Sequence, residues 1–180
     1  MKRGWWIFFG VLGVVLFFIG AFLYMSLAKP KSSGEQTVLQ NPANGLTFEE
    51  AKLKFDESFV YFLLVAIKAY ELHNPPLSSD SPKIEIVVGD KPFSAIIDKG
   101  QILVATRNID NPDIRINTPL DEAVLMVQNP NYVPNSFADG KSGIELLASK
   151  TTLFSKGYLG LYTELTGKSV TGNVARIYTG

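Results

Sequence analysis

Residues 83–117 read KIEIVVGDKPFSAIIDKGQILVATRNIDNPDIRIN, and this stretch decides the fold. Apolar residues alternate with other residues in four short segments, and such a period of two predicts β-strands with one face turned to a core. Gly89-Asp90 and Asp98-Lys99-Gly100 are typical of tight hairpin turns. The stretch therefore predicts an antiparallel meander covered on one face. Its expected strands are Lys83–Val88, Lys91–Asp98, Gln101–Arg107 and Asp113–Asn117.

A helix is expected directly before the meander. Thr47-Phe48-Glu49-Glu50 matches a capping box, and Asn74-Pro75-Pro76 stops a helix, so the pattern predicts one helix over residues 47–72. Its aromatic and small apolar side chains recur at three- and four-residue spacing, which indicates one buried face. The residues on that face are Phe48, Ala51, Phe55, Phe59, Phe62, Ala66 and Tyr70.

The residues after the meander favour helices with one added strand. Thr118-Pro119 is a strong start for a helix over residues 120–127. Ser136–Ala138 is expected to be a helical turn, and a second capping box at Ser142–Glu145 predicts a helix leading into residues 146–148. The segment Thr151–Ser155 is the expected fifth strand. A final helix is expected over Tyr158–Leu165, ended by Gly167.

The N-terminal residues carry an uncharged apolar run, Gly4–Ala28. As a helix it would be about 37 Å long, enough to cross a hydrocarbon core of about 30 Å. The run is longer than the apolar part of a cleaved signal peptide, and a core helix of so small a domain is rarely apolar all round. Both alternatives are weaker than a retained anchor. We therefore expect a transmembrane anchor over residues 1–28, a flexible polar linker over 29–45 and a domain over 46–180.

The charges that flank the apolar run bear on its orientation. Lys2, Arg3 and the terminal amine precede it, whereas Lys29 and Lys31 follow it. This small excess of positive charge predicts a cytoplasmic N-terminus. The chain is therefore expected to be a single-pass membrane protein whose domain lies outside the cytoplasm, with the bilayer as a partner.

Few residues in the chain could carry catalysis or bind a metal. The sequence has no cysteine, and His73 is its single histidine, so the usual zinc sites cannot form. His73 directly precedes Asn74-Pro75-Pro76 at an expected helix end, which favours a capping or surface role over catalysis. Asp110, Asn111 and Asp113 lack the spacing of a calcium loop and favour a turn. With 17 basic and 17 acidic residues and no basic run, nucleic acid is an unexpected partner. We expect no enzyme, no cofactor and no metal site.

Apolar side chains are abundant in all the expected elements of the domain. Burying one such side chain is worth about 1.5–3 kcal/mol, so a well-packed core explains them. The alternative is that the helices and the sheet leave a pocket for an apolar ligand. The candidate residues for that pocket are Phe55, Phe59, Phe62, Leu63, Phe93, Leu125, Phe137 and Leu147.

The order of elements over residues 46–165 resembles the sterol carrier protein 2 (SCP2) domain. Three sequence motifs of that family have similar counterparts here. They are Asp110-Asn111-Pro112-Asp113 followed by Ile114-Arg115-Ile116, then Phe137-Ala138-Asp139-Gly140-Lys141, and the final helix that begins after Gly157. The stretch Ser142–Lys156 is longer than the corresponding run of the family. The resemblance implies an α+β fold, with a mixed, largely antiparallel five-stranded sheet covered on one face by helices.

The resemblance also implies a function. SCP2 domains bind fatty acyl chains, sterols, phospholipids or isoprenoid quinone precursors in a hydrophobic tunnel and have no catalytic residues. We therefore expect a membrane-tethered domain that binds or presents a long-chain apolar lipid between the helix at 47–72 and the sheet. The alternative is an SCP2-like interaction scaffold with a filled core and no ligand.

Overall fold

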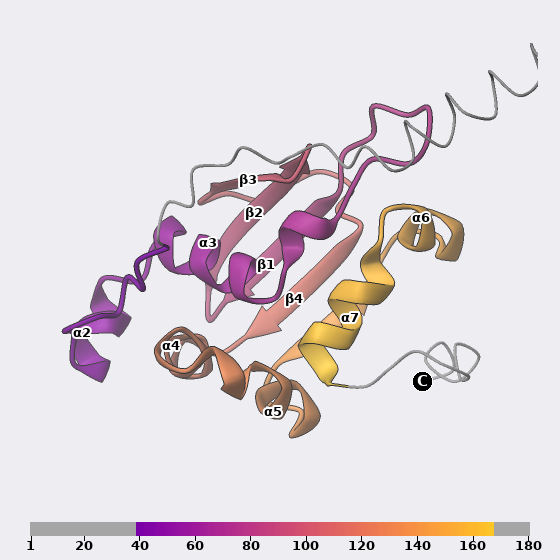
Figure 1. The fold of residues 1–180 in the computed structure, drawn as a ribbon. Helices are drawn as coiled ribbons and strands as arrows, with labels where there is room; N and C mark the ends of the chain where they lie inside the picture. The colour runs from indigo at the N-terminus through magenta and orange to yellow at the C-terminus, as the bar shows by residue number, and fades with distance from the viewer. Residues whose placement is uncertain (1–38, 168–180) are drawn as a thin grey trace, which may run out of the picture. The chain divides into compact units, whose positions relative to one another are not determined.

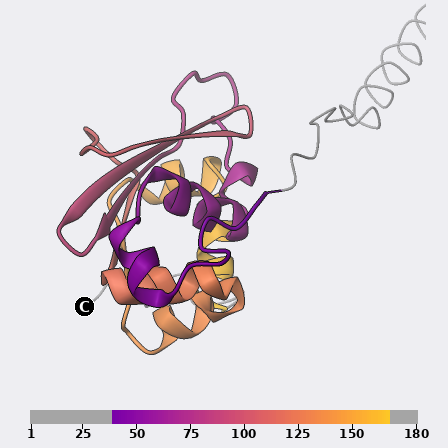
Figure 2. The same cartoon turned by 90° about the vertical axis from the view of Figure 1, so that its left-hand side faces the viewer.

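Five strands form one mixed sheet in the computed structural model, which describes residues 39–167. Their order across the sheet is β3-β2-β1-β4-β5, and the helices lie over one face of it (Figures 1 and 2). The expected α+β class with helices on one face of a five-stranded sheet is confirmed. The strands are β1 (Lys83–Val88), β2 (Lys91–Asp98), β3 (Gln101–Ala105), β4 (Ile114–Thr118) and β5 (Gly143–Leu146).

The fourth strand does not continue the meander as expected. The first three strands pair antiparallel, but β4 lies parallel to β1, with Ile84 opposite Ile114. The cause is the connection after β3, which carries the chain back across the sheet before β4 begins. Asp113 then fixes the start of β4 beside the start of β1, because its backbone N–H donates to the Lys83 carbonyl (2.8 Å) and its carboxylate accepts from the Lys83 N–H (2.8 Å).

The fifth strand is β5, and the expectation of a helix there was wrong. Ile144 lies opposite Ile116 and Leu146 opposite Ile114, so these two side chains face the core while Glu145 faces outward to Arg115. The Ser142 hydroxyl, expected to cap a helix, instead bonds Thr118 and Ser136. The expected strand Thr151–Ser155 was also wrong. It lies in helix α6 (Lys150–Ser155), whose first turn is capped by Ser149 accepting from the Thr152 N–H.

The expected single helix over residues 47–72 is three shorter ones. They are α2 (Phe48–Leu53), α3 (Glu57–Ala66) and the 3-10 turn η1 (Ala69–Glu71). The capping box of Thr47 and Glu50 forms as expected. The first break arises because the Asp56 side chain accepts from the Ser58 N–H and so starts a new helix. The second arises at Lys68, whose φ of 57° is incompatible with a continuing α-helix.

The remaining helices agree more closely with expectation. The helix expected at residues 120–127 is α4 (Leu120–Gln128), and the turn expected near Ser136 is α5 (Val133–Ala138), which follows the 3-10 turn η2 (Pro130–Tyr132). The final helix is α7 (Tyr158–Thr166). It ends at Gly167, whose φ of 65° is readily adopted by glycine.

The predicted membrane anchor at residues 1–28 lies outside the described residues. Across residues 39–167, no helix is both long and apolar enough to cross a bilayer. The last residues of the predicted linker are described and lie against α4. The Asn41 amide donates to the Val127 carbonyl (2.8 Å), and Ala43 is buried.

Candidate functional site

An apolar cavity lies between the helices and the helix-covered face of the sheet. Its walls come from α3, α4, α5 and α7 on one side and from β1 and β4 on the other. In Figure 1, α3 crosses in front of β1, and α7 lies beside β4. The lining residues are Val60, Leu63, Leu64, Ile67, Ile86, Val88, Ile116, Thr118, Met126, Val133, Phe137 and Leu165.

The sequence puts these side chains together through two periodicities. Ile86 and Val88 on β1 are two residues apart and so share the core face with Ile116 and Thr118 on β4. Val60 and Leu64 on α3 and Ile67 at its C-cap recur at spacings of four and three, which places them on one side of the helix. The cavity volume is about 40 Å³. This is room for a few water molecules but far below the roughly 300–1,000 Å³ of a typical ligand pocket.

Thr118 is the one residue with a polar side chain among the described residues of the lining, and its hydroxyl is turned away. It lies 2.8 Å from the Ser142 hydroxyl, which lies 2.8 Å from that of Ser136, and Ser136 donates to the Glu122 carboxylate at 2.9 Å. Because a carboxylate only accepts, Ser136 donates to Glu122. Ser136 therefore accepts from Ser142, and Ser142 accepts from Thr118. The threonine methyl is therefore what the cavity meets, and the lining is chemically a hydrocarbon.

The structure brings only some of the eight predicted pocket residues to the cavity. Leu63 and Phe137 line it, and both are half-buried. Phe55, Phe59 and Phe93 form a separate buried aromatic cluster beside it. The rings of Phe55 and Phe59 are 5.0 Å apart between centroids, and those of Phe55 and Phe93 are 6.1 Å apart.

The other three predicted pocket residues lie elsewhere. Phe62 is buried in the core without lining the cavity. Leu125 and Leu147 are exposed, on α4 and just after β5 respectively. Leu125 points outward because Val124, Met126 and Val127 are the α4 residues that the core buries. Aromatic content was therefore a weaker guide to the lining than the aliphatic alternation of β1 and β4, which was visible in the sequence.

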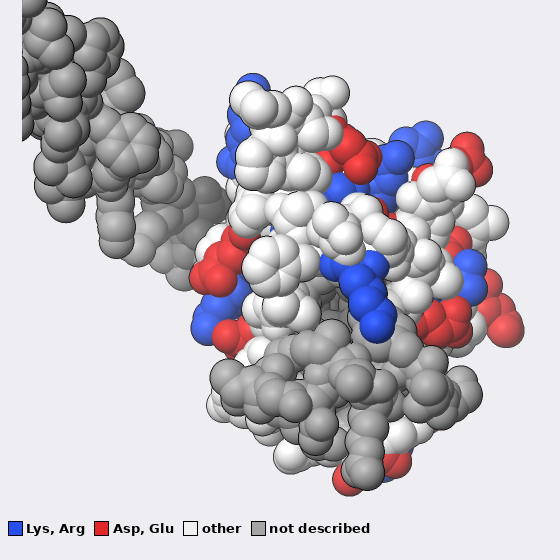
Figure 3. Space-filling view, turned by 90° about the vertical axis from the view of Figure 1, so that its right-hand side faces the viewer, with Lys and Arg blue, Asp and Glu red and all other residues white. Residues whose placement is uncertain are grey.

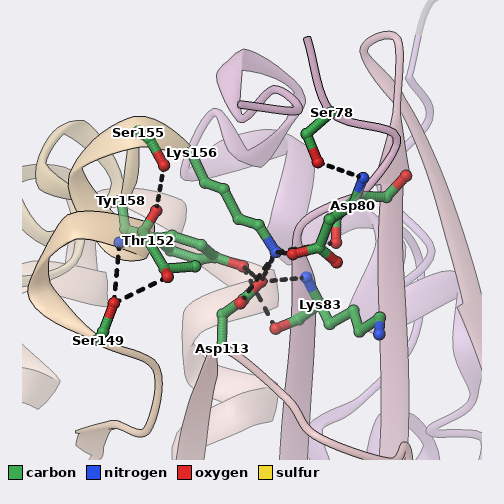
Figure 4. Close-up of polar contacts among 10 residues, drawn as sticks. Ser78, Asp80, Lys83, Asp113, Ser149, Thr152, Ser155, Lys156 and Tyr158 are labelled. Atoms are coloured by element: carbon green, nitrogen blue, oxygen red, sulfur yellow. Dashed lines mark hydrogen bonds and ion pairs between the residues drawn. The ribbon is translucent and has the colours of Figure 1, made fainter. Parts of the chain in front are cut away.

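A buried polar cluster at the opposite end of β1 and β4 was not expected from the sequence (Figure 4). We call it the Asp113 cluster, and its side chains are those of Asp113, Lys156, Tyr158 and Asp80. Lys156 is 1% exposed, and its Nζ lies 3.0 Å from both oxygens of Asp113 and 2.8 Å from Asp80. The Tyr158 hydroxyl donates to Asp113 at 3.0 Å.

The cluster fastens three segments that are far apart in sequence. Lys156 and Tyr158 flank the turn between α6 and α7, Asp113 precedes β4, and Asp80 precedes β1. Burial, with the Asp113 charge beside it, raises the pKa of the Tyr158 hydroxyl. The hydrogen bond from Lys156 lowers the pKa of Asp80. With Lys156 also within 3.3 Å of the Ser81 carbonyl, its donors are occupied, which indicates a structural role rather than a reactive lysine.

The single histidine is exposed, at the end of the η1 segment. Its Nδ1 lies 3.2 Å from the carbonyl of Asn74, and no other histidine can join it to form a metal site. Within residues 39–167, no group of three or more acidic or histidine side chains is arranged to hold a metal ion. On the face shown in Figure 3, basic and acidic side chains of the described residues are interspersed.

Comparisons with known proteins give weak likenesses of fold. No protein-family model matches the chain, and no curated protein sequence matches it. Among solved structures, a double mutant of the sec-alkyl sulfatase PisA1 matches at 11% identity and a TM-score of 0.37, over 62% of this chain. The chain spans only 17% of the length of that sulfatase.

Two further matches are SCP2 domains. Sterol carrier protein 2 like 2 from Aedes aegypti matches at 18% identity and a TM-score of 0.31, covering 54% of this chain and 92% of that one. The ubiquinone synthesis protein UbiJ-SCP2 matches at 11% identity and a TM-score of 0.34, covering 60% of this chain and 87% of that one. The structural neighbours thus include SCP2 domains, and at these scores no function is carried over from them.

Proposed function

We propose that the domain binds one long apolar chain, of the fatty acyl, sterol-like or isoprenoid kind, between α3, α7 and the sheet, and does so without catalysis. The observation that carries the proposal is the cavity itself. Its lining is hydrocarbon on every side, and its one threonine is held away by a chain of hydroxyls. A cavity of this kind gains from an apolar guest through the hydrophobic effect and offers no polar group to a reacting substrate.

The size of the cavity makes binding depend on movement. A volume of about 40 Å³ cannot hold a long chain, so the helices must part from the sheet or from one another for a ligand to enter. Apolar helix contacts suit such movement, because a bound hydrocarbon replaces the contacts that the helices lose. The bound state therefore has the same kind of core as the closed state, with the guest as part of it.

The membrane belongs to the proposal as the source of ligand. The apolar run at residues 4–28 has the length of a bilayer-spanning helix, and residues 29–38 connect it to the first described residues. We place the domain beside the bilayer on that basis, on the extracytoplasmic side by the charge bias around the run. Lipid would then pass between the bilayer and the cavity over a short distance.

The small volume also favours a second function, an interaction scaffold with a filled core. In that case the cavity is an ordinary packing defect, and no apolar molecule enters it. The two functions differ in one measurable property, which is whether the folded chain retains an apolar guest.

The test uses the full chain held in amphipol and equilibrated with 1-dodecanol or dodecane, followed by native mass spectrometry and thermal unfolding. The proposal predicts a retained guest and a higher melting temperature, since a ligand at a hundredfold excess over its Kd adds about 2.7 kcal/mol. Leu63→Trp, which enlarges a half-buried lining residue, should abolish retention. Tyr61→Trp, on the exposed side of the same helix, should leave it unchanged. A wild-type chain that never retains either guest favours the scaffold.

A further inference from the structure

The residue that follows the C-cap of α3 and the last turn of α7 are joined beside the cavity by an exposed ion pair. Lys68 Nζ lies 2.6 Å from Glu164 Oε1, and the two side chains are 46% and 39% exposed. Lys68 directly follows Ile67, and Glu164 directly precedes Leu165, and both of those neighbours line the cavity. The pair therefore bridges the two helices at the place where each contributes a side chain to the apolar lining.

The main contacts of the two helices are with different parts of the domain. At the start of α3, the Glu57 carboxylate accepts from the Thr106 backbone N–H (3.2 Å) and hydroxyl, just after β3. The Phe55–Phe59–Phe93 cluster holds the same end against β2. Helix α7 instead packs on α5 and α6. A separation of α3 from α7 would thus leave each helix attached to its own neighbours.

The start of α7 is fixed, whereas its end carries the cavity residue. Tyr158, the first residue of α7, is held by its hydrogen bond to Asp113, and Lys156 is held by the same carboxylate. Between them Gly157 has a φ of 86°, a conformation that side-chain-bearing residues rarely adopt. Leu165 lies seven residues after Tyr158, about 10 Å along the helix axis, and so is free of the contacts that fix the start of α7.

We propose that the Lys68–Glu164 pair is a latch over the entrance to the cavity, and that the entrance opens when the end of α7 separates from α3 while the start of α7 stays fixed at Tyr158. This inference rests on the proposed function, because it supplies the movement that a cavity of about 40 Å³ requires before it can take a long chain. The latch is weak because both of its side chains are exposed to solvent. An exposed ion pair shifts the equilibrium between the closed and the open state by about fivefold at most. It therefore slows entry without preventing it.

A surface pair elsewhere in the domain provides a matched control. Lys52 Nζ lies 2.7 Å from Asp121 Oδ1 and joins α2 to α4, and neither residue is part of the cavity lining. Glu164→Gln removes the charge of the latch, and Asp121→Asn removes that of the control pair, each without a change of shape. The absence of cysteine from the chain allows a covalent latch as well. In a Lys68→Cys, Glu164→Cys variant, the two thiols can be joined by a short bismaleimide in place of the ion pair.

The experiment follows entry of a photoreactive guest into the full chain. The chain is reconstituted in phosphatidylcholine nanodiscs that contain a neutral hexadecanol probe bearing a diazirine in its chain. Timed illumination and peptide mass spectrometry then report labelling of the lining residues Leu63, Phe137 and Leu165. We expect Glu164→Gln to raise the initial labelling rate by about two- to fivefold, and Asp121→Asn to leave it at the wild-type value. The bridged cysteine variant should lose most labelling, and the same variant without the bridge should keep it.

The outcomes separate the latch from the proposed function. Wild-type labelling of the cavity peptides that neither Glu164→Gln nor the bridge alters would overturn the latch while leaving apolar binding intact. A wild-type chain that shows no labelling there would overturn both. Circular dichroism of the bridged variant identifies any loss of fold, and in that event the comparison of Glu164→Gln with Asp121→Asn decides by itself.

Discussion

At the scale of single residues, the buried pair of Lys156 and Asp113 holds the turn between α6 and α7 against the start of β4. Both side chains are buried, at 1% and 7% exposed, so neither charge can be left without its partner. Lys156→Met should therefore lower the free energy of unfolding by about 3–5 kcal/mol. Urea unfolding of the variant measures this. Asp113→Leu combined with Lys156→Met should recover part of the loss, because the double change leaves no buried charge. A Lys156→Met variant as stable as the wild type would show that the pair is unimportant.

Tyr158 makes the stability of the domain depend on pH in the alkaline range. Its raised pKa means that the folded state keeps the hydroxyl proton while the unfolded state loses it above about pH 10. The contribution of the Tyr158 hydroxyl to the free energy of unfolding is thus fully present below pH 10. Above pH 10 it falls by about 1.4 kcal/mol per pH unit. The Tyr158→Phe variant should lack that slope, so the difference in the free energy of unfolding between wild type and variant should change with pH above pH 10. At neutral pH it should cost about 1–3 kcal/mol, because Asp113 loses a donor. Parallel curves above pH 10 would contradict this assignment.

Residue-level reasoning from the sequence missed this cluster for a physical reason. Lys156 and Asp113 are 43 positions apart, and neither lies in a motif that predicts a partner. Asp113 was expected in a turn with Asp110 and Asn111, at the start of the fourth strand. The structure confirms a loop there but directs Asp113 inward, because the parallel pairing of β4 with β1 brings it to the Lys83 backbone.

At the scale of elements, α3 has two tasks in successive turns of the helix. Phe59 belongs to the aromatic cluster that holds α3 to the sheet, whereas Leu63, one turn on, lines the cavity. Phe59→Ala should cost about 3–5 kcal/mol as a core cavity mutation. It should leave retention of dodecanol unchanged under conditions where the variant is folded. Guest binding measured by native mass spectrometry at low temperature makes this comparison. Loss of the guest in a folded Phe59→Ala chain would place the binding site among the aromatic rings instead.

The break between α2 and α3 depends on one capping side chain. Asp56 accepts from the Ser58 N–H at 2.9 Å and so fixes where α3 begins. Asp56→Ala should lower the free energy of unfolding by about 0.5–2 kcal/mol, and Asp56→Asn, which keeps the cap, should cost less. Chemical denaturation of both variants tests this. Equal stability of the alanine variant and the wild type would mean that α3 starts there without help from the cap.

Elements were predictable where their pattern is long and uninterrupted. The strands β1 and β2 and the helices α4 and α7 follow directly from alternation, helical spacing and terminal glycine. The pattern was misleading over Phe48–Tyr70, because aromatic spacing continues through Asp56 and Lys68 as if one helix ran on. It was also misleading at β5, whose four residues are too few to distinguish a strand from a helix start.

At the scale of the whole molecule, the domain has two layers, a five-stranded sheet and the short helices that cover one of its faces. Short helices bury little surface each, so their positions depend on contacts with the sheet and on ties such as the Asp113 cluster. The class of fold and its covered face were predictable from the pattern of elements. The cavity lining was predictable only in part, since its position depends on how β4 pairs and where α7 lies, and both are set by contacts between distant residues.

The measurement that tests the binding proposal most directly is methyl NMR of the full chain in amphipol, with the isoleucine methyl groups labelled, before and after addition of dodecane. Ile67, Ile86 and Ile116 line the cavity, whereas Ile97 and Ile102 are buried in the same sheet core away from it. Entry of an apolar guest predicts shifted signals, and contacts to dodecane protons, at the first three residues, with Ile97 and Ile102 little changed. Signals that stay unchanged at Ile67, Ile86 and Ile116, or that shift equally at all five, would contradict a ligand site between the helices and the sheet.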